Sequence, residues 1–91
     1  MYTFGQLLRI QRNKNRLLQR EVWETTGIPY SKISQYENDR QRPSPRNFKK
    51  LITLYKTEER PREYREITEA YEEIRLLSHS WRVIYDRDDK E

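Results

Sequence analysis

Side chains that could support catalysis or hold a metal are sparse in this chain of 91 residues. It has no cysteine, and His79 is its only histidine. A zinc site needs several cysteine or histidine ligands, and an activated nucleophile needs a base held beside it. The only glycines are Gly5 and Gly27, so no glycine-rich phosphate loop is present. We therefore predict no catalytic residue, no metal site, no cofactor and no enzymatic activity.

Cationic side chains are concentrated in the N-terminal part of the chain. Residues 1–56 carry 12 Lys and Arg against 4 Asp and Glu, whereas residues 57–91 carry 7 against 11. A basic segment of this kind is suited to contact with a polyanion. We predict a basic binding domain over residues 1–56 and an acidic C-terminal helix over residues 57–91 that dimerises or binds a partner.

The elements that must position these side chains are predicted to be helices. Apolar residues recur at three-to-four spacing, which indicates an all-α fold with helices over about 4–13, 19–26, 29–38, 44–55 and 61–85. The boundaries carry residues typical of helix starts and stops, namely Thr3 with Gln6, Gly27, Pro29, Ser44 with Pro45, and Pro61. A basic loop over residues 38–43 joins the third helix to the fourth.

The second and third predicted helices carry a specific pattern. Residues 19–38 read QREVWETTGIPYSKISQYEN, with Gln first, an aliphatic residue three later and Gly eight later. Ile-Ser lies in the middle of the next helix and Tyr-Glu closes it. This pattern resembles the helix-turn-helix of the Xre/Cro family of phage and bacterial repressors, over roughly residues 4–56. The resemblance implies a small five-helix, repressor-like domain with the helix-turn-helix in its second and third helices, and the fifth of these helices is the long C-terminal one.

The resemblance also implies roles for individual residues. The third helix would enter the major groove and present its first turn to base edges, while the second helix crosses the backbone. The DNA-binding residues implied are Gln19, Tyr30, Ser31, Lys32, Ser34, Gln35, Asn38, Arg40, Arg42 and Arg46. Of these, Gln19 and the residues from Asn38 onward would contact phosphate, and Lys49 extends that row. Arg12 and Glu37 match an internal ion pair, to which we assign a structural role.

Each binding role has a simpler alternative. Tyr30 has helical spacing to Ile33 and could be a partly buried core aromatic. Lys32 and Gln35 could belong to a solvated helix face, and the loop arginines could serve solubility alone.

Two residues depart from the family pattern. Trp23 stands where the family usually has a small residue, so either the crossing of the two helices is opened or the indole turns aside. We expect Trp23 to pack against the protein, because reading a duplex needs no stacking platform. Leu18 stands where Ser or Thr usually caps the second helix, which forfeits a cap worth about 1 kcal/mol.

The C-terminal helix, about 36 Å long as predicted, carries an apolar stripe at alternating three and four spacing. Such a stripe needs a partner surface, and we expect a homodimer through it. The dimerisation residues predicted are Ile67, Tyr71, Ile74, Leu77 and Trp81. A chain cut after Lys56 should then be a folded monomer. The alternative is that the helix folds back over the first and fourth helices.

Together these observations predict a sequence-specific regulator of transcription that binds double-stranded DNA, acting as a homodimeric repressor on a palindromic operator. Two alternatives are the antitoxin of a toxin-antitoxin pair and a helical protein adaptor, although the basic N-terminal part weighs against the adaptor. The chain has no apolar run of membrane-spanning length, and its start lacks the pattern of a signal peptide. We expect a cytoplasmic protein of phage or bacterial origin.

Overall fold

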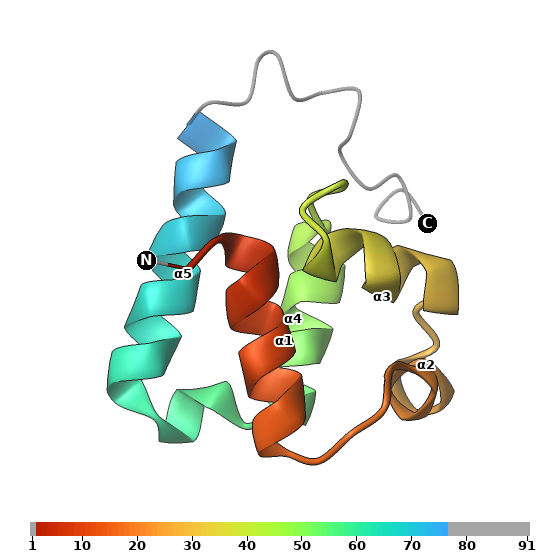
Figure 1. Ribbon diagram of the computed structural model, residues 1–91. Coiled ribbons are helices and arrows are strands. Elements are labelled where there is room, and N and C mark those ends of the chain that lie inside the picture. Colours follow the sequence, from red (N-terminus) through yellow and green to blue (C-terminus); the bar gives the residue numbers. More distant parts are fainter. Residues whose placement is uncertain (1, 77–91) are drawn as a thin grey trace.

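A computed structural model describes residues 2–76 of the chain, shown in Figure 1. Five α-helices and one short 3-10 helix follow one another over these residues: α1 (Phe4–Lys14), α2 (Gln19–Thr26), α3 (Tyr30–Glu37), α4 (Pro45–Leu54), η1 (Thr57–Glu59) and α5 (Pro61–Leu76). No β-strand occurs within this part of the chain. The all-α fold and the order of the five helices are as the sequence predicts.

The boundaries of three helices are set by the predicted local signals. At α1 the Gln6 backbone N–H donates to Thr3 Oγ1 at 3.1 Å, and the Thr3 N–H donates to Gln6 Oε1 at 2.9 Å. At α4 the hydroxyl of Ser44 accepts from the Asn47 N–H at 3.1 Å. Gly27 ends α2 with a φ of 79°, a left-handed conformation that glycine adopts without the clash of a Cβ.

The start of α2 lacks a side-chain cap, as the presence of Leu18 predicts. Leu18 is exposed, and Glu21 supplies partial compensation because its carboxylate accepts the Leu18 backbone N–H at 2.8 Å. A carboxylate in the first turn also interacts favourably with the partial positive charge at the helix N-terminus.

The hydrophobic core lies between the inner faces of all five helices. Its buried members are Phe4, Leu7, Leu8, Val22, Ile28, Ile33, Tyr36, Leu51, Ile52, Tyr55, Ile67 and Tyr71. Ile33, one helical turn from Tyr30, is in this core. Tyr30 is not, because half of its surface is exposed. The alternative that Tyr30 is a core aromatic is therefore wrong.

Helix α5 packs back against the domain, and this corrects the predicted dimer seam. Ile67 and Tyr71 are buried in the core of their own chain, and Ile74 packs against it. The Tyr71 ring is stacked on Phe48, with centroids 4.1 Å apart, and its hydroxyl donates to the Pro43 carbonyl at 2.9 Å. Ile67 and Tyr71 are thus unavailable to a second chain, whereas Leu77 and Trp81 lie outside the described residues.

A polar network joins the segment after residue 56 to α1. The amide oxygen of Gln11 accepts from the Thr57 hydroxyl at 3.1 Å and from Arg60 Nη1 at 3.0 Å. The amide nitrogen of Gln11 donates to Glu63 Oε1 at 2.6 Å, and this bond lowers the pKa of Glu63. The predicted boundary between residues 56 and 57 therefore does not separate two structural units within residues 2–76.

Gly5 allows α1 to approach the end of α3 closely. A Cβ at this position would lie 2.5 Å from the Glu37 carbonyl oxygen and 2.7 Å from that of Tyr36, both backbone atoms. We expect Gly5→Ala to lower the free energy of unfolding by about 1–3 kcal/mol, because rigid backbone must move to admit the methyl group. Denaturant unfolding measures this, with Thr53→Ala on the exposed surface of α4 as control. A loss no larger than that of the control would show that α1 moves away without cost.

Candidate nucleic-acid interface

The outer face of α3 carries most of the residues predicted to read bases. Ile33 and Tyr36 point into the core, which leaves the opposite side of the helix accessible. Tyr30 and Ser31 are exposed, and Lys32, Ser34 and Gln35 are partly exposed. Figure 1 shows α2 and α3 on the side of α1 away from α5, so the described helix α5 does not cover this face. The five predicted readers therefore share one accessible surface.

Two polar residues near α3 make local contacts. The side-chain amide of Asn38 donates to the Ser34 carbonyl at 2.8 Å and closes the last turn of α3. Lys32 Nζ donates to Gln41 Oε1 at 3.2 Å, which links the helix to the following loop. Together these contacts fix the position of the following loop relative to the end of α3.

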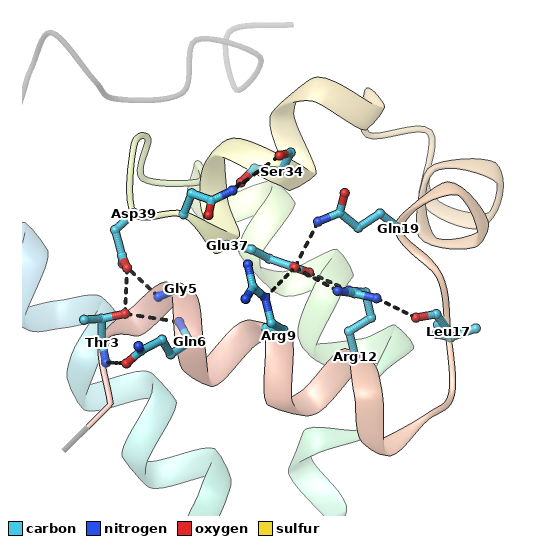
Figure 2. A network of polar contacts seen from close by, with 11 residues as sticks. Thr3, Gly5, Gln6, Arg9, Arg12, Leu17, Gln19, Ser34, Glu37 and Asp39 are labelled. Atoms are coloured by element: carbon cyan, nitrogen blue, oxygen red, sulfur yellow. Dashed lines mark hydrogen bonds and ion pairs between the residues drawn. The ribbon is translucent and has the colours of Figure 1, made fainter.

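Glu37 is the centre of a buried polar cluster that joins three helices, as Figure 2 shows. Arg12 Nε donates to one carboxylate oxygen at 2.7 Å, and Arg12 Nη2 donates to the other at 3.0 Å. The ion pair predicted between these two residues is therefore present. The carboxylate is 1% exposed, and its hydrogen bond raises the pKa of Arg12 above the usual value.

Two further residues complete the cluster around Glu37. Gln19 Nε2 donates to Glu37 Oε1 at 3.0 Å, and Arg9 Nε lies 3.5 Å from the same oxygen. The resemblance implied that Gln19 contacts phosphate, yet its amide nitrogen is bonded to the last residue of α3. The cluster consequently fixes α2 and α3 relative to α1, which is what a rigid reading surface requires.

Asp39 anchors the loop after α3, a role that the sequence reading missed. Its carboxylate accepts from the Thr3 hydroxyl at 2.6 Å and from the Gly5 backbone N–H at 2.9 Å, both at the start of α1 (Figure 2). Asp39 has a φ of 58°, a left-handed conformation in which aspartate is enriched. The sequence feature that could have indicated this role is that Asp39 is the only acidic residue in the basic loop over residues 38–43.

The loop arginines differ in accessibility, and one prediction is wrong. Arg40 is exposed, as is Arg46 at the start of α4, so both can reach a phosphate. Arg42 is only 3% exposed, and its guanidinium carbon lies 4.0 Å from the centre of the Tyr71 ring. This cation–π contact holds the charge inside the domain. Arg42 therefore supports the fold and is not a phosphate contact.

A basic groove continues from Arg46 along α4. It is lined by Thr25, Thr26, Arg46, Lys49, Lys50, Thr53 and Leu54, so it lies between the end of α2 and the outer side of α4. Three of these side chains are cationic and none is acidic. The predicted row of phosphate contacts through Lys49 thus lies along a surface of one charge.

Trp23 does not pack into the domain as expected. Its indole on α2 is 45% exposed, whereas Val22 beside it is fully buried. Of the two alternatives for this position, the exposure indicates that the indole turns aside. The bulky residue at a position where the family usually has a small one indicated an unusual packing here. The sequence did not indicate in which direction the side chain turns.

Two other classes of site are absent from the described residues. No group of three or more His, Cys, Asp and Glu side chains in residues 2–76 is arranged to hold a metal ion. Over the same residues, no helix combines the length and apolarity needed to cross a membrane.

Comparison with known families identifies the arrangement of α2 and α3. A family model described as a helix-turn-helix domain matches residues 3–65, from the cap of α1 into the first turns of α5. The match covers more than half of the chain and extends past residue 56, in agreement with the shared core. Comparisons with curated proteins and with solved structures found no match.

Proposed function

The chain belongs to the helix-turn-helix family of Xre/Cro-like DNA-binding domains, and we propose that it is a sequence-specific regulator of transcription that binds double-stranded DNA without catalysing a reaction. The observation that carries this proposal is the accessible face of α3 beside exposed cations. Tyr30, Ser31 and Gln35 lie on that face, and Arg40 and Arg46 flank it. Amide and hydroxyl groups can discriminate base edges, while guanidinium groups bind phosphate.

A selection from random duplexes, followed by footprinting of the enriched sequence, tests the proposal. We expect one preferred sequence to emerge and to be protected on the major-groove side. The DNA that flanks the chain's own coding region is the natural second DNA to test for binding. Enrichment of no sequence, together with failure to bind any duplex, would contradict the proposed function.

Two substitutions separate base reading from phosphate binding. Gln35→Ala should cost about 1–3 kcal/mol on the preferred sequence and relax selectivity at one base pair. Arg46→Ala should weaken binding to all sequences alike and reduce the slope of log K against log salt by about 1. Binding isotherms at several salt concentrations measure both effects, with Arg65→Ala on α5 as the charge-matched control. Equal, sequence-independent losses from Gln35→Ala and Arg46→Ala would reverse these roles.

The finer proposal is a homodimeric repressor that binds a palindromic operator in the cytoplasm. One reading helix covers few base pairs, so two half-sites linked by a dimer give the affinity that a regulator needs. Because Ile67 and Tyr71 are buried in their own chain, the dimer must use other surfaces. Light scattering and the symmetry of the footprint test this step. A monomer that protects a single half-site would contradict it and favour the antitoxin alternative.

A further inference from the structure

Large apolar side chains are exposed at an unexpected place in this domain. Five are exposed within residues 2–76, namely Tyr2, Leu18, Trp23, Tyr30 and Tyr64. Three of the five lie in or beside α2 and α3, on the unit to which we assign DNA binding. Apolar groups clustered on a binding unit indicate that a partner covers them.

The helical geometry of α2 shows which way Trp23 faces. Thr25 and Thr26 both line the groove against α4, and at 100° per residue Trp23 lies about 160° around the helix from Thr25 and about 60° from Thr26, so it lies to one side of the groove. Gln19 is one turn before Trp23 on nearly the same side, and it is bonded to Glu37 of α3. Trp23 therefore projects on the α3 side of α2, where it is still nearly half exposed.

We propose that Trp23 is a DNA-contacting residue that packs its indole against the deoxyribose wall of the major groove. The inference rests on the proposed function. With α3 in the groove, α2 crosses the sugar–phosphate backbone, so a side chain on the α3 side of α2 meets sugar and phosphate. The indole offers an apolar face for the sugar and one N–H donor for a phosphate oxygen. The contact adds affinity and carries no base preference.

An uncharged contact has a signature that distinguishes it from the neighbouring cations. Arg46 and Lys49 release counterions when they bind phosphate, so their removal changes the salt dependence of binding. Trp23 carries no charge, and its loss should weaken binding equally at every salt concentration. The slope of log K against log salt should therefore stay the same while the affinity falls.

The first test compares affinities for one short duplex of unselected sequence. We expect Trp23→Ala to weaken binding roughly three- to tenfold with an unchanged salt slope. Trp23→Phe, which keeps an aromatic face but loses the N–H donor, should lie between Trp23→Ala and the parent. Tyr64→Ala on α5, another exposed aromatic, should bind as the parent does. Thermal melting of each variant confirms that the fold is retained.

The second test follows the indole itself. Trp81 is the only other tryptophan, so Trp81→Phe leaves Trp23 as the sole indole emitter. We expect duplex binding to shift its emission and to protect it from acrylamide quenching. Binding with unchanged emission, unchanged quenching and an unaffected Trp23→Ala affinity would overturn this inference alone. Failure of both the full chain and Trp81→Phe to bind any duplex would overturn the proposed function and this inference with it.

Discussion

Replacing Glu37 by alanine is expected to lower the free energy of unfolding by about 3–5 kcal/mol, because it removes the anion from a buried charge cluster. The Arg12 side chain is only 12% exposed and would keep its charge without its bidentate partner. Gln19 would lose the acceptor of its amide nitrogen in the same step. Removing the carboxylate should also make α2 and α3 more mobile relative to α1, since the carboxylate joins both helices to α1.

Chemical denaturation of the parent and variant measures the effect, and two further variants show its origin. Glu37→Gln keeps the size of the side chain and one acceptor oxygen, so its loss of stability should be smaller than that of Glu37→Ala. Arg9→Ala should cost under about 1 kcal/mol, because Arg9 is half exposed and its Nε is 3.5 Å from the carboxylate. If Glu37→Ala melted like the parent and only DNA binding fell, the cluster would serve the interface and not the fold.

The parts of the fold that the sequence predicted correctly depend on neighbours in the chain. The helix starts and stops depend on contacts between residues only a few positions apart, as at Thr3 with Gln6, at Ser44 and at Gly27. Such contacts can be predicted from sequence spacing. The Arg12–Glu37 pair is long-range, and it was predicted only because the family resemblance supplied the pairing. Without that resemblance, no local pattern joins residues 25 positions apart.

The errors arose where one pattern fits two structures. An apolar stripe on α5 has the same spacing whether it faces a second chain or its own domain, so Ile67 and Tyr71 could not be assigned from periodicity. Arg42 looked like a loop cation because its aromatic partner, Tyr71, lies far along the chain. Asp39 was missed for the same reason, since its contacts are with residues at the start of α1.

The corrected position of α5 reverses the expected behaviour of a chain cut after Lys56. That fragment should not fold cooperatively, although the sequence alone predicted a folded monomer. It lacks Ile67 and Tyr71 from the core and Thr57 from the Gln11 network. Losing two core side chains of this size costs about 5–10 kcal/mol, which is comparable with the whole stability of a typical domain.

The loss of stability in the fragment 1–56 is explained by the aromatic cluster around Tyr71 of α5. Phe4 and Phe48 both contact the Tyr71 ring, with centroids 5.6 Å and 4.1 Å away, and would face water without it. Arg42 would lose the ring over which its guanidinium lies. The loop that carries Arg40 would then be released from α5, so duplex binding should fall together with the fold.

Circular dichroism and thermal melting of the fragment 1–56 test this expectation, with a chain cut after Leu76 as the matched control. The control keeps every described helix and should melt cooperatively, because all the core residues named above remain. Tyr71→Phe removes only the hydroxyl that donates to Pro43, and about 1 kcal/mol should be lost. A fragment 1–56 that melts cooperatively and binds duplex DNA would show that the first four helices form a core without α5. In that case α5 would not be needed for folding, and its apolar stripe could pack against a second chain instead of its own domain.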